Sequence, residues 1–130
     1  MSELKSVTVQ LRSVVLAFGD NVVLRDINLD IEAGEFFAFL GPSGSGKSTL
    51  LRLIAGFGPT PEGQVLIDDE DVARLPPWKR NVGMVFQNYA LWPHMSVHRN
   101  VAFGLEERRL PASEVRERVD AALDVVGLRD

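Results

Sequence analysis

One stretch limits the possible folds of this chain more than any other: Gly41-Pro-Ser-Gly-Ser-Gly-Lys-Ser-Thr49. It fits the pattern G-x-x-x-x-G-K-[ST], in which a glycine-rich loop surrounds phosphate groups with main-chain N–H groups. The apolar run at 35–40 precedes the loop and predicts a buried strand. The run at 50–55, which ends at Gly56, predicts a helix. The sequence therefore indicates a strand, a phosphate-binding loop and a helix in succession.

The residue types of this loop match the chemistry of a triphosphate. Glycine permits the positive backbone angles that turn successive N–H groups toward an anion. The N-terminus of the following helix adds its positive dipole end, and Lys47 is expected to reach the β- and γ-phosphates, while Ser48 ligates Mg²⁺. The alternative is a Gly/Ser-rich turn that binds nothing. The expected phosphate-binding residues are Gly41, Pro42, Ser43, Gly44, Ser45, Gly46, Lys47, Ser48 and Thr49.

The rest of the chain changes from strand-like to helical character. Alternating or continuous apolar residues predict strands at 7–18, 22–24, 28–31, 64–67 and 81–86. Ser96 is a helix-capping residue type and predicts a helix from 97 to about 105. An apolar face over 113–126, followed by Gly127, predicts a second helix. We therefore expect a β-rich core over about 1–95 and a helical subdomain over about 96–130.

Composition excludes several classes of protein. A chain of 130 residues is long enough for one domain, and its net charge of −4 gives no support for a nucleic-acid partner. The absence of cysteine excludes disulfides and thiolate metal sites. Residues 1–6 contain an acid where a signal peptide has bases, and no apolar run approaches a membrane span. Any work at a membrane must therefore depend on docking to another protein.

Two groups of polar residues could suggest metal sites. The acidic run at 68–71 lies where a hairpin turn is expected and lacks the spacing of a calcium loop, so we interpret it as a solvated turn. His94 and His98 have no acid or cysteine nearby in sequence that would complete a metal site or a catalytic triad. We expect both histidines to be structural or interface residues. The surrounding stretch at 88–95 is rich in large apolar groups, which suggests a contact surface.

Several motifs together resemble one family. These are the loop at 41–49, Val85-Phe-Gln87, Tyr89-Ala-Leu-Trp-Pro-His-Met-Ser-Val97 and Asn100-Val-Ala-Phe-Gly104. They resemble the nucleotide-binding subunit of ATP-binding cassette (ABC) transporters, most closely the importers of sugars, polyamines, ferric iron or phosphonates. The resemblance implies an α/β fold: a P-loop NTPase core with an N-terminal antiparallel β subdomain and the start of an α-helical subdomain.

The resemblance also implies roles for individual residues. Phe18 matches the aromatic residue that stacks on adenine; the alternative is a plain core aromatic at a strand end. Gln87 matches a glutamine that contacts Mg²⁺ and the attacking water, so Lys47 and Gln87 are the expected catalytic residues, and Ser48 and Gln87 the metal ligands. ATP and Mg²⁺ are the implied cofactors. Residues 89–97, from Tyr89 to Val97, match the surface that receives a membrane permease subunit, and a second ATPase subunit is the other implied partner.

The sequence departs from the family pattern after the second predicted helix. It contains no Leu-Ser-Gly-Gly-Gln type signature, no following strand with its magnesium-binding aspartate and catalytic glutamate, and no switch histidine. The chain thus resembles a truncated, front half of the cassette. We expect it to bind nucleotide but to hydrolyse it very poorly. Unpaired strand edges near the loop would make such a fragment marginal, prone to aggregate or to pair with another copy, unless the rest of the protein exists.

The function that these features predict is the ATP-binding subunit of an importer, which hydrolyses ATP to drive solute uptake. Such a subunit is cytoplasmic and peripheral on the inner (plasma) membrane. One alternative is a non-transport ABC ATPase of the DNA-repair or translation kind, but the short spacing of about forty residues from Lys47 to Gln87 disfavours it. A second alternative is a non-catalytic nucleotide-binding fragment, which steady-state phosphate release would distinguish.

Overall fold

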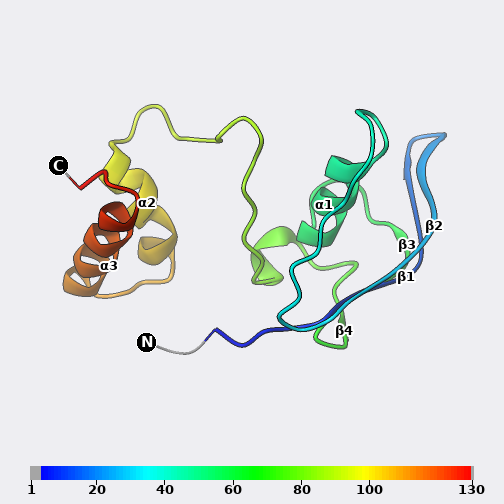
Figure 1. Cartoon of the computed structure of the whole chain (residues 1–130), viewed down its shortest axis with the longest axis horizontal. Coiled ribbons are helices and arrows are strands. Elements are labelled where there is room, and N and C mark those ends of the chain that lie inside the picture. The colour runs from blue at the N-terminus through cyan, green and yellow to red at the C-terminus, as the bar shows by residue number, and fades with distance from the viewer. Residues whose placement is uncertain (1–3, 130) are drawn as a thin grey trace. The chain divides into compact units, whose positions relative to one another are not determined.

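The computed structural model describes residues 4–129, which form two compact units that divide between Met84 and Val85 (Figure 1). Residues 1–3 and Asp130 lie outside the described residues. Residues 1–3 belong to the N-terminal stretch that was interpreted above as unlike a signal peptide. Among residues 4–129, no helix is both long enough and apolar enough to cross a bilayer.

The first unit contains an antiparallel sheet and one α-helix. Its elements in chain order are β1 (Val9–Phe18), β2 (Asn21–Ile31), α1 (Lys47–Ala55), β3 (Glu62–Ile67), β4 (Glu70–Asp71) and a 3-10 turn, η1 (Pro77–Lys79). The strand order is β2-β1-β3-β4, and each neighbouring pair is antiparallel. The predicted antiparallel β subdomain is therefore present, and the two short strands expected at 22–24 and 28–31 are parts of the single strand β2.

A bulge in β1 keeps its apolar side chains on one face. Leu11 and Val14 are both fully buried although they are three residues apart, which simple alternation does not allow. The register of β1 shifts between Leu11 and Val14 against β2, and between Arg12 and Val15 against β3. Ser13 adopts a φ of 47°. The Asn28 side chain accepts the freed Ser13 N–H at 2.9 Å. The extra residue thus restores the inward orientation of the second half of the strand.

Helix α1 packs its apolar side against the sheet. Leu53 lies in the buried cluster with residues of β1, β2 and β3, and Leu50 and Ile54 pack against the same cluster. The helix ends where predicted: Gly56 has a φ of 95° and donates to the carbonyls of Arg52 and Leu53. This left-handed ending is the helix-capping role that glycine performs best.

The predicted strands at 35–40 and 81–86 are not formed. Within the described residues the sheet comprises only β1 to β4, and neither segment pairs with it. A strand exists only where a partner takes up its N–H and C=O groups, so an apolar run without a partner remains an extended segment. Phe36 is 98% exposed and Val85 is 97% exposed, which shows that these runs lack the burial that their composition predicts.

The acidic stretch at 68–71 forms a hairpin turn, as expected. Asp68 and Asp69 adopt φ values of 51° and 65°, the pair of positive angles found in a tight two-residue turn. Glu70 and Asp71 follow as the short strand β4, paired with β3. The Asp71 carboxylate accepts the backbone N–H of Ala73 at 3.0 Å, so part of this charge organises the next loop.

The second unit is helical. It contains α2 (Val97–Glu107) and α3 (Ala112–Val125), whose buried contacts are made by Ala102, Val115, Val119 and Leu123. Ser96 caps α2 as predicted, since its hydroxyl oxygen accepts the Arg99 N–H at 3.2 Å. α2 extends two residues beyond the expected end at 105, and Gly127, with a φ of 70°, follows α3 as predicted.

Candidate functional site

The loop at 41–49 has the backbone of an anion-binding nest. Gly44 and Gly46 adopt φ values of 81° and 93°, a region that other residues enter only with strain. The Ser45 N–H donates to the Pro42 carbonyl at 3.2 Å, which closes the turn. At Gly41, a Cβ atom would lie 2.7 Å from the Ser45 Oγ, so a side chain here would force the Ser45 hydroxyl to move. The loop is exposed from Gly41 to Ser45 and thus open to a ligand.

Helix α1 begins at this loop without a side-chain cap. Its N-cap residue is Gly46, which has no side chain to accept the N–H groups of the first turn. Ser48 lies in that turn and is exposed. Uncapped N–H groups at the positive end of a helix dipole, beside an exposed hydroxyl, fit the oxygens of a phosphate group and a hard cation bound to them.

The Lys47 ammonium lies across the loop. It donates to the Gly41 carbonyl and, at 3.1 Å, to the Pro42 carbonyl. The side chain therefore folds back over the nest instead of extending into solvent. A cation beside a helix N-terminus without a side-chain cap favours a strongly negative ligand.

The β1–β2 hairpin contacts the same loop. A Cβ atom on Gly46 would lie 3.1 Å from the Leu24 Cδ2, and Leu24 pairs with Leu16 across the hairpin. Phe18, the residue expected to stack on adenine, ends β1 two register pairs further along, opposite Asn21. It is 51% exposed and lies outside the buried cluster. The structure thus keeps about half of this residue accessible in the unit that contains the loop.

Gln87 and residues 89–97 belong to the second unit, whereas the loop and Phe18 belong to the first. Gln87 is exposed in a short turn. Tyr89 and Ala90 follow with φ values of 63° and 53°, and the Ala90 N–H donates to the Asn88 carbonyl at 2.7 Å. This turn leaves Tyr89 86% exposed, so the predicted contact surface presents an aromatic side chain to solvent.

Asn100 organises the contact surface, a role that sequence reasoning missed. Its side-chain oxygen accepts the Trp92 N–H at 2.9 Å, and its amide nitrogen donates to the carbonyls of Trp92, Met95 and Ser96 at 3.0 to 3.2 Å. The Trp92 ring packs on Phe103 with 4.2 Å between ring centroids. One amide on α2 therefore holds the loop that precedes the helix. The position of Asn100, four residues after a capping serine, was the available sequence signal.

Arg80 is the second residue that sequence reasoning missed. It is only 7% exposed and lies at the C-terminal end of α1, the end opposite the phosphate loop. Burial lowers the pKa of Arg80, and the nearby Asp71 carboxylate partly offsets this by raising it. The guanidinium remains protonated at any physiological pH. Nothing in the run Pro76-Pro-Trp-Lys-Arg80 distinguishes this arginine from an ordinary surface residue, so its burial was not predictable.

Within residues 4–129, no group of three or more His, Asp or Glu side chains is arranged to hold a metal ion.

Comparison with known proteins gives a consistent result. The family model described as ABC transporter matches residues 24–130. The chain is 46% identical over 120 residues to the spermidine/putrescine import ATP-binding protein PotA of Bacillus thuringiensis (strain Al Hakam), covering 92% of this chain and 37% of that protein. It is 52% identical over 120 residues to the putative 2-aminoethylphosphonate import ATP-binding protein PhnT of Salmonella typhimurium, covering 92% of this chain and 32% of that protein.

The chain thus spans about a third of the length of the curated relatives it matches. The matched part includes the phosphate loop, the extended segment that ends at Gln87, and both helices of the second unit. The glycine-dependent nest, the lysine that covers it and the family match agree: this chain belongs to the ABC transporter family.

Proposed function

We propose that this chain is part of the ATP-binding subunit of an ABC importer, which binds ATP and, in the complete protein, hydrolyses it to drive solute uptake. The observation that supports this most directly is the Lys47 ammonium placed over a nest at the uncapped N-terminus of α1. A loop built this way stabilises clustered negative charge. The relatives named above as import proteins support the transport assignment.

Each predicted site residue then has a role in binding. The loop N–H groups and Lys47 hold the β- and γ-phosphates, Phe18 stacks on the adenine, and Ser48 and Gln87 hold Mg²⁺. When bound, Mg²⁺ supplies positive charge that neutralises the phosphate oxygens. The complete protein would add the water-activating acid, which this sequence lacks, so phosphate release by the chain itself is expected to be very slow.

The same proposal assigns the partners. Residues 89–97 present apolar side chains on the second unit and dock a membrane permease subunit, with Tyr89 exposed at one end and Val97 at the other. A second ATPase subunit completes the assembly. The protein works on the cytoplasmic face of the inner membrane, bound there through its permease partner.

Titration of the chain with a fluorescent ATP analogue and Mg²⁺ tests this proposal, with phosphate release followed in the same samples. We expect saturable binding by the wild type and loss of most of the affinity in Lys47→Ala, since the variant removes the only ammonium in the loop. Lys5→Ala is the matched control. It removes the same charge from an exposed ion pair with Asp68 in the same unit, and such pairs contribute little to stability.

Three results would separate the alternatives. Binding that is lost in Lys47→Ala but not in Lys5→Ala, with very slow phosphate release, supports the proposal. Fast steady-state phosphate release would contradict the expectation that the missing acid is essential. Equal affinity of the wild type and Lys47→Ala would show that the loop is not the phosphate site.

A further inference from the structure

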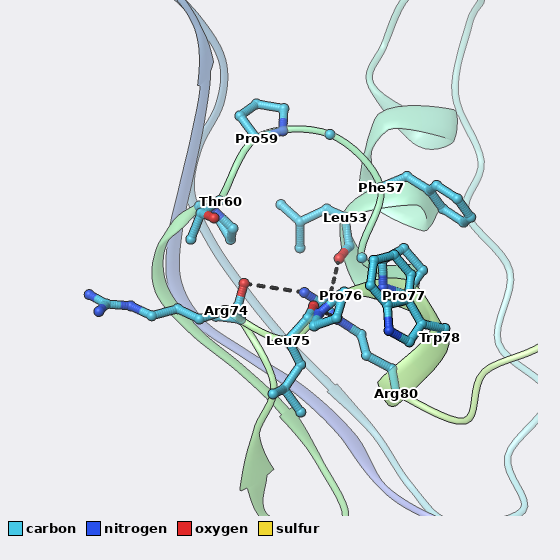
Figure 2. A pocket seen from close by; sticks show the side chains of 14 residues that line it. Leu53, Phe57, Pro59, Thr60, Arg74, Leu75, Pro76, Pro77, Trp78 and Arg80 are labelled. Atoms are coloured by element: carbon cyan, nitrogen blue, oxygen red, sulfur yellow. Dashed lines mark hydrogen bonds between the residues drawn. The ribbon is translucent and has the colours of Figure 1, made fainter.

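A buried arginine connects α1 to a distant part of the first unit. Arg80 is the buried charged residue among those described, and it lies beside a cavity of about 270 Å³ at the C-terminal end of α1. Figure 2 shows its guanidinium between Leu53 of α1 and the segment of Arg74 and Leu75, whereas the Arg74 side chain points away from the cavity. The cavity is therefore closed on one side by a charge that water barely reaches.

The guanidinium donates to four backbone carbonyls on two segments. Its Nη1 donates to Leu53 at 3.0 Å and Ile54 at 3.2 Å, both in the last turn of α1. Its Nε donates to Leu75 at 2.8 Å and its Nη2 to Ala73 at 3.2 Å, both in the segment after β4. The planar fork of five N–H donors suits this task, because one side chain reaches acceptors in several directions.

Gly56 makes room for this arrangement. A Cβ atom at Gly56 would lie 2.6 Å from the Arg80 Nε and 2.9 Å from its Cζ, so the guanidinium rests directly on the glycine that ends the helix. The positive charge also lies at the negative end of the α1 dipole. Charge, shape and hydrogen bonding therefore all favour the same orientation of the helix end.

Fixing one end of α1 also fixes the other. The helix is nine residues long, a rigid rod whose first two residues are Lys47 and Ser48. Leu53, one of the residues that packs α1 on the sheet, is also one whose carbonyl Arg80 holds. A shift of the helix along or around its axis would move the first turn, where phosphate is expected to bind, relative to the hairpin that contains Leu24 and Phe18.

We propose that Arg80 is a positioning residue for the phosphate loop, which acts through α1 without touching the nucleotide. This rests on the proposed function of the loop. The reason is geometric: Arg80 ties the C-terminal turn of α1 to the segment after β4, through acceptors at Leu53 and Ile54 that lie 27 and 26 residues before it in sequence. Small displacements of binding groups cause large losses of ligand affinity, because the strength of charge-assisted hydrogen bonds depends steeply on distance and angle.

The test combines nucleotide titration with hydrogen exchange on Arg80→Met, Arg80→Lys and Val14→Ala. Methionine keeps the apolar stem without the fork, and lysine keeps the charge but cannot reach both segments in the same way. Val14→Ala is the control, since Val14 is fully buried in the core but makes no contact with a ligand in this proposal. All titrations are made at a temperature at which each variant is folded.

We expect Arg80→Met to bind the fluorescent ATP analogue with Mg²⁺ about tenfold or more weakly than the wild type, and Arg80→Lys to be intermediate. Val14→Ala should keep wild-type affinity despite a lower unfolding temperature. In hydrogen exchange, Arg80→Met should expose the amides of 50–55 selectively, while those of β1 stay protected. If Arg80→Met does not fold, the lysine variant provides the same comparison.

The outcomes distinguish this inference from the proposed function. Wild-type affinity in a folded Arg80 variant, or a loss no greater than that of Val14→Ala, would overturn the positioning role. If the wild-type chain itself binds no nucleotide, the proposed function fails. Hydrogen exchange then remains as the test of whether Arg80 holds α1 in place. Uniform exchange over 50–55 and β1 in Arg80→Met would then overturn it, and selective exchange at 50–55 would support it.

Discussion

Gly46 is the residue at which loop shape, helix start and hairpin packing meet. It has a φ of 93°, precedes the first residue of α1, and faces Leu24 so closely that a Cβ atom would lie 3.1 Å from the Leu24 Cδ2. Backbone angle and space therefore both select glycine here. At Gly44 only the angle does, because a Cβ atom there would meet nothing within 4 Å.

Gly46→Ala should lower the free energy of unfolding by about 1 to 3 kcal/mol, because alanine at a positive φ is strained. It should also weaken binding of the ATP analogue, since relief of this strain distorts the nest. Thermal unfolding and nucleotide titration measure the two effects. Gly83→Ala is the control, as Gly83 lies in open space with an ordinary φ. Equal behaviour of the two variants would contradict the argument.

At the scale of elements, the capping residues were predictable and the strands were only partly so. Ser96, Gly56 and Gly127 act through local backbone geometry, which a short stretch of sequence specifies. The runs at 35–40 and 81–86 were predicted as strands from composition alone. A strand depends on a partner strand, which a local stretch of sequence does not specify, and in the described residues neither run has one.

The residues of the candidate site also differ in whether their roles depend on local sequence or on contacts across the fold. The loop pattern predicts the phosphate-binding residues at 41–49, because the function of such a loop depends on consecutive positions. Arg80 and Asn100 donate hydrogen bonds to backbone carbonyls of other residues, and every residue type has such a carbonyl. Sequence patterns describe side chains, so roles that depend on backbone acceptors are visible only in the structure.

The side chain of Asn100 holds the loop at 92–96 through hydrogen bonds to its backbone. Asn100→Ala removes its four hydrogen bonds to that loop and should cost about 1 to 2 kcal/mol locally, because exposed carbonyls regain water. Trp92 should then leave Phe103 and its fluorescence should shift to the red. The measurement is made in a Trp78→Phe background, which leaves Trp92 as the single tryptophan.

Asn100→Asp provides the graded comparison. Its carboxylate retains the acceptor for the Trp92 N–H but loses the amide donor to the carbonyls of Trp92, Met95 and Ser96. We expect an intermediate shift of the emission. An unchanged spectrum in both variants would mean that the packing of Trp92 on Phe103 holds the loop without Asn100.

At the scale of the whole molecule, the exposed apolar runs govern behaviour in solution. Phe36 and Leu40 in the first unit and Val85 in the second are almost fully exposed, on segments whose backbone has no strand partner. Unpaired backbone beside apolar side chains is a template for pairing with another chain. The weight-average mass in sedimentation should therefore rise with protein concentration.

The double variant Phe36→Ser, Leu40→Ser should reduce this association strongly. Val125→Ser is the control, because Val125 is also exposed but lies in α3, where the backbone is already hydrogen-bonded. A similar reduction in both variants would indicate general apolar adhesion. A selective reduction in the double variant would identify the segment at 35–40 as the surface through which the chains associate.

The position of Lys47 has a consequence for ligand choice. Its ammonium is already hydrogen-bonded to the carbonyls of Gly41 and Pro42. These two carbonyl oxygens therefore compete with a bound phosphate for the Lys47 ammonium. A ligand that draws the ammonium away from these carbonyls must break both hydrogen bonds, which lowers its net affinity. The attraction of a ligand with several phosphate charges to the ammonium exceeds the loss of these hydrogen bonds, whereas the attraction of a singly charged ligand only about balances it. We therefore expect the loop to bind polyphosphates in preference to small anions of single charge.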